Sequence, residues 1–385
     1  MSDGHAPLAG VRVLDLTDRL GWYTGRLLAL LGAEVLRIED PNKPQGPPLP
    51  PAVVVNGRTV SFHEEFAHSG KVTSMLDLAS EEGASGLVEL VESTDVLLSG
   101  LDGRAPGGWA DINPRLVHIV ITAFGWAHTP HDDAIDDLLI LAAGGLLHLG
   151  GYPDSGPIVP YGGQSYIAAG IYAASAAMFG LIQVERDGSG YWADVSAQET
   201  MAQALEDSLP GYVLTGKIRP PEGAEGKEAG TGTYACADGY VSMVAGRLGT
   251  ARAWASLVDW LTSECVEATE LLDDKWSDFA YRQTTEANAR FRQIFEAFAS
   301  TRSKETLYLD AQSRMIALSP VSDVSDLLAN AQLRHRGFFS KYDHPTLHRV
   351  VTAPGPPFRF AGVELPVLGP AVEIGTPAFS DRGSA

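Results

Sequence analysis

The chain of 385 residues has little cysteine and far fewer basic than acidic side chains. Its two cysteines, Cys236 and Cys265, are too few for a disulfide framework and lack the spacing of a zinc site, which predicts a reducing, cytoplasmic setting. The formal net charge of -20 argues against binding to nucleic acid or to an anionic membrane, because rows of phosphates need cationic partners. We therefore expect a soluble protein whose partners are not polyanions.

The chain also lacks the short motifs of common catalytic sites. The N-terminal MSDGHAPLAG has no basic stretch followed by an apolar run, so we expect no signal peptide. No P-loop, nucleophile elbow, zinc motif or kinase signature is present, and the turn DLTDRLGWY lacks a dinucleotide-binding G-x-G-x-x-G. One loop holds four candidate ligands, but without an i, i+4 pair on a helix we expect no metal site there; the four are His128, His131, Asp132 and Asp133.

Short apolar, β-rich runs alternate with helical segments in the first part of the chain. This alternation predicts a doubly wound, parallel α/β sheet with helices on both faces. The expected strands are Gly10–Leu16, Glu34–Ile38, Val72–Leu76, Asp95–Leu98 and Leu116–Ile121.

A long apolar helix is predicted from about Ile167 to Val184. Its apolar residues are largely alanine and glycine, so neighbouring backbones can approach it closely, as in a core helix. It lacks flanking lysine or arginine anchors, which favours a soluble protein over a membrane span. Farther along, Ser196 and Glu199 have the spacing of a capping box that begins a second helix.

The length of the chain exceeds what a single core usually supports, so two domains are expected. Gly211–Gly232 is rich in glycine, proline and charge and is typical of a linker with a mobile loop. A hairpin around Asp238-Gly239 and several amphipathic helices then predict a second domain, followed by a helix at Asp323–Leu333. We expect a large domain to begin with residues 1–210, a linker and glycine loop over 211–232, a small domain over 233–320, and a return to the large domain over 321–385.

Several segments, taken in their order, resemble CoA-transferase family III, the CaiB/BaiF family that also contains α-methylacyl-CoA racemases. They cover nearly the whole chain: PLAGVRVLDLTDRLGWYTGRLLALLGAEVLRIEDP, GKVTSMLDL, ESTDVLL, INPRLVHIVITAFG, DDLLILAAGGLLHLGG, RDGSGYWADVSAQE, GTYACADGYVSM and RGFFSKYDHP. The resemblance implies a Rossmann-like large domain built from both ends of the chain, a smaller α+β domain, and a dimer of interlocked subunits.

In these transferases an Asp carboxylate attacks an acyl-CoA thioester, and CoA passes between carboxylic acids through covalent intermediates. The resemblance implies that CoA thioesters are substrates or ligands and that no cofactor is tightly bound. It places a shielding glycine loop at Gly226, Gly230 and Gly232, and CoA contacts at Lys71 and Arg104. Asp102 beside Arg104 would weaken the contact with CoA phosphates.

The family's nucleophilic Asp lies four residues before a glycine, and Gly170 matches that glycine, so Tyr166 stands at the nucleophile's position. A phenol with a pKa of about 10 is a poor substitute for a carboxylate. The chain thus resembles the subunit without the Asp in two-subunit members such as benzylsuccinate CoA-transferase. We therefore expect a CoA-transferase subunit in a homomeric or heteromeric dimer, with the active Asp on a partner chain.

Two alternatives involve Asp136 and Asp137, which stand at the start of a predicted helix, where capping is their default role. In the first alternative, Asp136 and Tyr166 would exchange protons at an acyl-CoA α-carbon, as the His and Asp of the racemases do. In the second, Asp136 or Asp137 would be the nucleophile of a self-sufficient transferase.

Overall fold

The computed structural model describes residues 5–43, 46–100, 107–126, 136–221, 223, 226, 228–245, 251–264 and 266–380. The chain divides into two compact units. The large unit comprises residues 1–147, 159–217 and 331–385, and the small unit comprises residues 148–158 and 218–330. Both ends of the chain therefore belong to the large unit.

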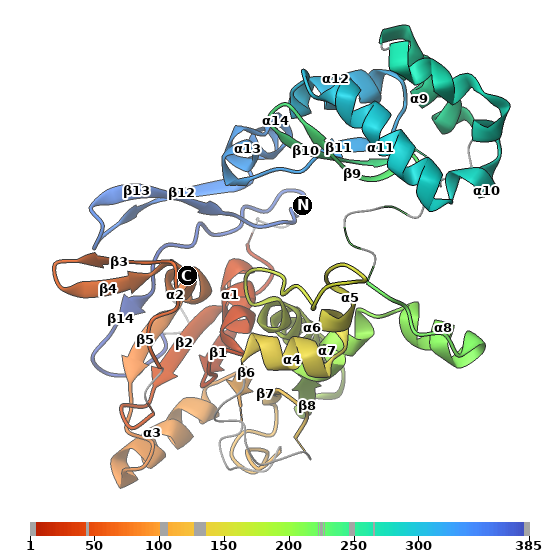
Figure 1. Cartoon of the computed structure of the whole chain (residues 1–385). Helices are drawn as coiled ribbons and strands as arrows, with labels where there is room; N and C mark the ends of the chain where they lie inside the picture. Colours follow the sequence, from red (N-terminus) through yellow and green to blue (C-terminus); the bar gives the residue numbers. More distant parts are fainter. Residues whose placement is uncertain are drawn as a thin grey trace. The chain divides into compact units, whose positions relative to one another are not determined.

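A parallel sheet of seven strands forms the centre of the large unit (Figure 1). Its order is β14-β5-β2-β1-β6-β7-β8, so the chain first builds outward from β1 and then returns to add strands on the other side, as in a Rossmann fold. The strands are β1 (Arg12–Asp15), β2 (Glu34–Glu39), β5 (Val72–Met75), β6 (Val96–Ser99), β7 (Val117–Thr122), β8 (Tyr191–Ser196) and β14 (Val372–Glu373). The five strands expected from the sequence are confirmed, and the C-terminal β14 adds an edge strand.

Helices cover both faces of this sheet because successive strand residues point to opposite sides. Val13 and its same-face neighbours pack with α1 (Trp22–Leu30), α4 (Asp137–Ala143), α6 (Gln164–Asp187) and α7 (Ala197–Gln203). Leu14 and its neighbours pack with α3 (Glu81–Glu92) on the other face. The doubly wound α/β fold predicted from the alternating runs is thus confirmed.

The predicted core helix is α6, and its small residues have the expected effect. A Cβ at Gly180 would lie 2.1 Å from Tyr191 Cε1, and one at Gly170 would lie 2.9 Å from Tyr23 Cβ. Among the described helices α6 is the one long and apolar enough to cross a membrane, but 39% of its most apolar window is buried inside the protein. Length and composition alone are weak evidence for a membrane span.

The large unit also contains shorter elements outside the central sheet. Two hairpins are built from β3 (Ala52–Val55) with β4 (Arg58–Ser61) and from β12 (Phe339–His344) with β13 (Arg349–Pro354). The remaining helices are α2 (Phe62–His68), α8 (Ser208–Thr215) and α14 (Ala331–His335), while α5 (Leu146–Leu149) spans the boundary between the large and the small unit.

The small unit packs helices against an antiparallel sheet of order β11-β10-β9. The hairpin predicted at Asp238-Gly239 joins β9 (Thr231–Cys236) to β10 (Gly239–Val244), and β11 is Leu318–Pro320. The helices are α9 (Ala251–Glu264), α10 (Phe279–Arg282), α11 (Thr285–Ala299), α12 (Lys304–Ser313) and α13 (Val324–Ala329), with 3-10 turns at Val266–Leu272 and Asp274–Ser277. Their core is aromatic, centred on Trp254, Trp276, Phe291 and Phe295.

Two local predictions were wrong. The predicted helix Asp323–Leu333 is two helices, α13 and α14, because Asn330 between them is extended (φ -60°, ψ 119°). The predicted linker at Gly211 begins inside α8, which ends at Gly216 in the left-handed conformation (φ +68°). Pro210 is tolerated there because it lies in the first turn of α8, where its missing N–H has no intrahelical partner to lose.

Candidate functional site

The N-terminus of α6 is held by a side chain from α4. Gly162 (φ +93°) and Gly163 (φ +62°) turn the chain into α6, which has no capping side chain of its own at Gly163. Instead, Asp137 Oδ1 accepts hydrogen bonds from the backbone N of Ser165 at 2.8 Å and from Ser165 Oγ at 2.7 Å. The carboxylate of Asp137 thus caps α6 and fixes the backbone immediately before Tyr166.

The structure brings Tyr166 together with both candidate carboxylates. Burial, together with the negative charges of Asp136 and Asp137, raises the pKa of Tyr166 to about 12, although a hydrogen bond with the backbone of Asp137 opposes part of this rise. The phenol therefore keeps its proton at neutral pH. It can donate a hydrogen bond, but it is a poor base and a poor nucleophile.

Asp136 is the N-cap of α4. Its Oδ1 accepts from the backbone N of Leu138 at 2.8 Å, which is the capping role that its position predicts. Both carboxylates near Tyr166 are therefore oriented by helix ends.

His63 of α2 approaches the same corner, although no motif in the sequence pointed to it. A Cβ at Gly163 would lie 3.4 Å from Tyr166 Cδ2 and 3.9 Å from His63 Cε1. Burial lowers the pKa of His63, so the imidazole is neutral at neutral pH. A larger residue than glycine at 163 would meet both rings.

Lys71 is locked in an ion pair inside the large unit. Its Nζ lies 2.8 Å from Asp15 Oδ2 and donates to the carbonyl of Trp22 at 2.8 Å, and both charged side chains are fully buried. Burial lowers the pKa of Lys71 more than Asp15 raises it. A Cβ at Gly25 would lie 2.6 Å from Asp15 Oδ2 and 2.9 Å from Lys71 Nζ, so α1 can pass this pair only with glycine there.

This arrangement does not present Lys71 to a phosphate, and its direct contact with CoA stays a prediction. Asp15 was not predicted as the partner of Lys71, although an acidic residue at the end of an apolar strand is a usable signal. Arg104 and Asp102, the other residues predicted near CoA phosphates, lie outside the described residues, as do His128, His131, Asp132 and Asp133.

The predicted glycine loop belongs to the small unit. A Cβ at Gly226 would lie 1.7 Å from the carbonyl oxygen of Thr231, and Gly230 and Gly232 have φ values of +85° and +140°. Glu228 between them is buried and accepts from Thr231 Oγ1 at 3.0 Å. These positions need glycine for their backbone geometry, which is also what a close-fitting loop needs.

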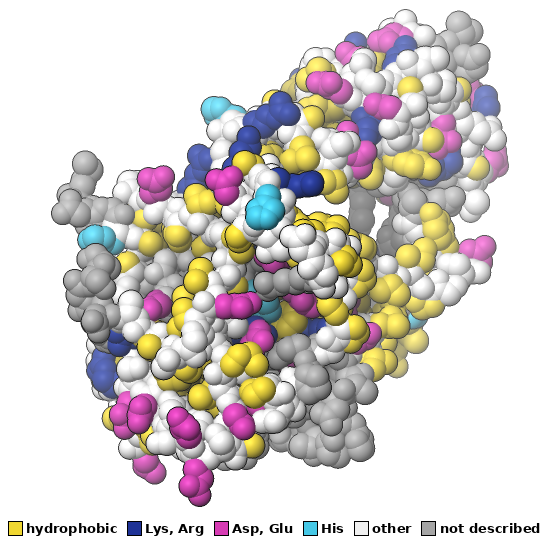
Figure 2. Space-filling model, turned by 90° about the vertical axis from the view of Figure 1, so that its left-hand side faces the viewer, with side chains coloured by type: hydrophobic (Ala, Val, Ile, Leu, Met, Phe, Trp, Pro, Cys, Tyr) yellow, Lys and Arg dark blue, Asp and Glu magenta, His cyan; other side chains and the backbone are white. Residues whose placement is uncertain are grey.

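Within the described ranges, no group of three or more histidine, cysteine, aspartate or glutamate side chains is placed to hold a metal ion. Figure 2 shows one face of the molecule, on which several acidic side chains lie near the bottom of the view.

Comparisons with known proteins agree along the whole chain. The sequence model of "CoA-transferase family III" matches residues 8–376. The chain is 35% identical to the "Succinyl-CoA:(R)-benzylsuccinate CoA-transferase subunit BbsE" of Thauera aromatica, over 96% of this chain and 94% of that one. It is 25% identical to the "Succinate--glutarate CoA-transferase" of Agrobacterium fabrum, over 88% of this chain and 85% of that one.

A solved structure gives the same result for the fold. The crystal structure of a CAIB/BAIF family protein from Brucella suis superposes with a TM-score of 0.81 at 24% identity, covering 95% of this chain and 96% of that chain. The match over residues 8–376 and the 35% identity to the BbsE subunit show that the chain belongs to CoA-transferase family III.

Proposed function

We propose that this chain is the subunit without the nucleophile in a two-subunit CoA-transferase, and that a homologous partner chain supplies the attacking Asp. The observation that carries the proposal is Tyr166, which stands four residues before Gly170 and whose pKa is raised to about 12. A protonated phenol cannot attack a thioester as a carboxylate does. The similarity to a protein named as a transferase subunit supports the same division of labour.

The contacts of Asp136 and Asp137 favour a nucleophile on the partner chain over attack by either of these two carboxylates. A nucleophile must be free to move toward the carbonyl carbon, but Asp137 Oδ1 is held by two hydrogen bonds from Ser165. Asp136 is held by its bond from the backbone N of Leu138. Attack by either residue would uncap a helix.

Exposed apolar side chains on two helices of the large unit support assembly with a partner. They lie on α6 and α8, and such a group of exposed apolar side chains usually marks an interface. The residues, with their exposed fractions, are Ile171 (48%), Phe179 (69%), Leu209 (67%), Val213 (75%) and Leu214 (83%). We infer an interlocked dimer in the cytoplasm, formed with the catalytic homologue, in which these helices are covered. A monomer by light scattering of the co-expressed pair at micromolar concentration would contradict this assembly.

The proposed reaction is the transfer of CoA between carboxylic acids. The two relatives are named for succinyl-CoA or succinate together with a second dicarboxylic acid, so succinyl-CoA is the donor to test first. This chain would shape the acyl pocket around the partner's intermediate, with Tyr166 as a hydrogen-bond donor rather than a nucleophile.

A trapping experiment tests the proposal. The purified chain is incubated with succinyl-CoA, treated with borohydride or hydroxylamine, and measured by intact-mass spectrometry. We expect no adduct on this chain alone, and an adduct on the partner when a homologue with Asp at this position is co-expressed. An adduct on the isolated chain that is lost in Asp136→Asn or Asp137→Asn would instead identify a self-sufficient transferase.

The same preparation tests proton transfer at the α-carbon. Because the pKa of Tyr166 is about 12, its phenol stays protonated at neutral pH and is a poor base for that reaction. We therefore expect no exchange of solvent deuterium into the α-position of a 2-methylacyl-CoA. Exchange that is abolished by Tyr166→Phe would favour the racemase-like alternative.

A further inference from the structure

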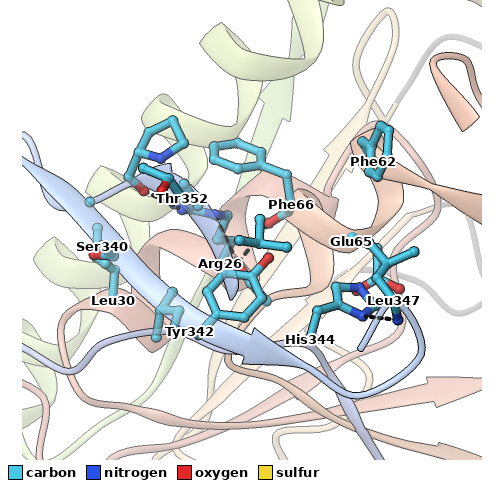
Figure 3. A pocket seen from close by; sticks show the side chains of 16 residues that line it. Arg26, Leu30, Phe62, Glu65, Phe66, Ser340, Tyr342, His344, Leu347 and Thr352 are labelled. Atoms are coloured by element: carbon cyan, nitrogen blue, oxygen red, sulfur yellow. Dashed lines mark hydrogen bonds and ion pairs between the residues drawn. The ribbon is translucent and has the colours of Figure 1, made fainter. Parts of the chain in front are cut away.

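The large unit contains a cavity lined by residues of α1, α2 and the β12–β13 hairpin. Its volume is about 240 Å³, and Figure 3 shows Tyr342 and His344 of the hairpin facing the side chains of the two helices. On α2 the lining residues are Phe62, Glu65 and Phe66, which share one helix face. His63, which lies close to Gly163 beside Tyr166, does not line the cavity.

His344 places a buried donor without a hydrogen-bond partner at this cavity. Its Nδ1 accepts from the backbone N of Leu347 at 3.2 Å, so the neutral ring carries its proton on Nε2. Nε2 lies 3.3 Å from Glu65 Oε2, but the geometry of a hydrogen bond is not met, and the side chain of His344 is 97% buried. A buried donor without an acceptor is costly, so a ligand that supplies an acceptor is stabilised.

The charges in the cavity select against ionic ligands. Arg26 is 4% exposed, with Cζ 3.8 Å from the centre of the Phe66 ring, and its Nε donates to Ser69 Oγ at 3.1 Å. The wall thus carries one charge of each sign, so an ionic ligand that pairs with Arg26 or Glu65 also lies near a group of its own sign, whereas an uncharged ligand is opposed by neither. Most of the remaining wall is apolar, with Phe62, Leu347 and Val351 among its residues, and the residues with hydroxyl groups are Ser69, Ser340, Tyr342 and Thr352.

We propose that this cavity is a second small-molecule site, which takes an uncharged carboxamide carried on a small apolar body. The amide oxygen accepts from His344 Nε2 while the amide N–H donates to Glu65, so the two polar groups of the wall are bridged by one ligand group. The apolar body packs against Phe62 and Val351. The volume suffices for an aromatic ring with its amide, since a cavity of about 150 Å³ already holds benzene.

Three probes that share a ring but differ in the charge of the head group test the proposal: benzamide, benzoate and benzylamine. Binding to the wild-type chain is measured by calorimetry and by saturation-transfer NMR, without CoA, so the result does not depend on the proposed function. We expect benzamide to bind at least tenfold more tightly than either ion. Equal or tighter binding of benzoate or benzylamine, or no binding of benzamide, would overturn the proposal.

Variants locate the site. Val351→Trp fills the cavity and should abolish benzamide binding, whereas Val350→Trp, on the neighbouring and exposed position of β13, should leave it unchanged. Glu65→Gln removes the negative charge and should raise the affinity for benzoate about tenfold, a gain that misfolding cannot produce. Equal benzamide binding by the two tryptophan variants, or no gain for benzoate, would place the ligand elsewhere and refute the assignment.

Discussion

The raised pKa of Tyr166 predicts a measurable dependence of stability on pH. Its pKa in the folded chain is about 12, above the value of about 10 for an exposed phenol, because burial and two carboxylates disfavour the phenolate. The folded state therefore binds the proton more tightly than the unfolded state does. Stability from this group is complete below pH 10 or so and is lost as the pH rises toward about 12.

We therefore expect Tyr166→Phe to lower the unfolding free energy less at high pH than at neutral pH. The control is Tyr161→Phe, since Tyr161 is 86% exposed. Urea unfolding of the three proteins at pH 8 and pH 11 gives the comparison. A wild-type advantage over Tyr166→Phe that grows with pH would show that the phenol is not held in its protonated form.

Breaking the ion pair between Lys71 and Asp15 should destabilise the fold strongly, and this can be measured without any ligand. Lys71→Met leaves the buried carboxylate of Asp15 unpaired and should cost about 3–5 kcal/mol of unfolding free energy. Lys341→Met, at an exposed lysine of β12, should lower the unfolding free energy by less than about 1 kcal/mol. In a double-mutant cycle, the double variant Lys71→Met/Asp15→Asn should lose less unfolding free energy than the sum of the losses in the two single variants. Additive costs would mean that the pair does not stabilise the fold.

At the scale of elements, the contact between α1 and α6 depends on Gly170. A Cβ there would lie 2.9 Å from Tyr23 Cβ and 3.2 Å from the backbone N of Thr24, so Gly170→Ala forces α1 away and should cost about 1–3 kcal/mol. Gly86, inside α3, has Leu76 Cδ1 at 3.8 Å as the nearest atom, so Gly86→Ala should stabilise by up to about 1 kcal/mol. Thermal unfolding distinguishes the two, and the same sign for both would contradict the packing argument.

Elements were predictable where local chemistry alone determines them. Apolar runs marked the parallel strands, and Ser196 caps α7 by accepting from the backbone N of Glu199, which is one half of the capping box that the spacing predicted. Helix α8 was missed because Pro210 and Gly211 resemble a linker, and the break at Asn330 was missed because an extended residue between two helices leaves no local signal.

For the site, the motif order placed Tyr166 at the position of the nucleophile, but spacing could not show which contacts surround it. The hydrogen bonds from Ser165 to Asp137 and from Lys71 to Asp15 join residues 28 and 56 positions apart, so they depend on how the sheet and helices pack. Lys71 shows the limit most clearly, because its position in a familiar motif did not reveal that its ammonium is fully buried.

At the scale of the whole molecule, the net charge of -20 opposes an anionic ligand such as CoA, whose phosphates need local cations or helix N-termini. With Lys71 held by Asp15, that local attraction is reduced. Repulsion from charges spread over the molecule is already screened at about 0.1 M salt, where the Debye length is about 10 Å. Above that concentration, added salt mainly weakens the remaining close contacts.

We therefore expect this chain alone to bind free CoA weakly, with an affinity that falls further between about 0.1 and 0.5 M salt. Calorimetry at several salt concentrations measures this, and dephospho-CoA is the matched control, because loss of the 3′-phosphate should reduce the salt dependence. Arg104→Gln, at the cation that the family resemblance predicts near the CoA phosphates, should weaken CoA binding and remove most of the difference between the two ligands. Tight binding that is insensitive to salt and unaffected by Arg104→Gln would show that CoA is held by backbone groups or apolar contacts instead.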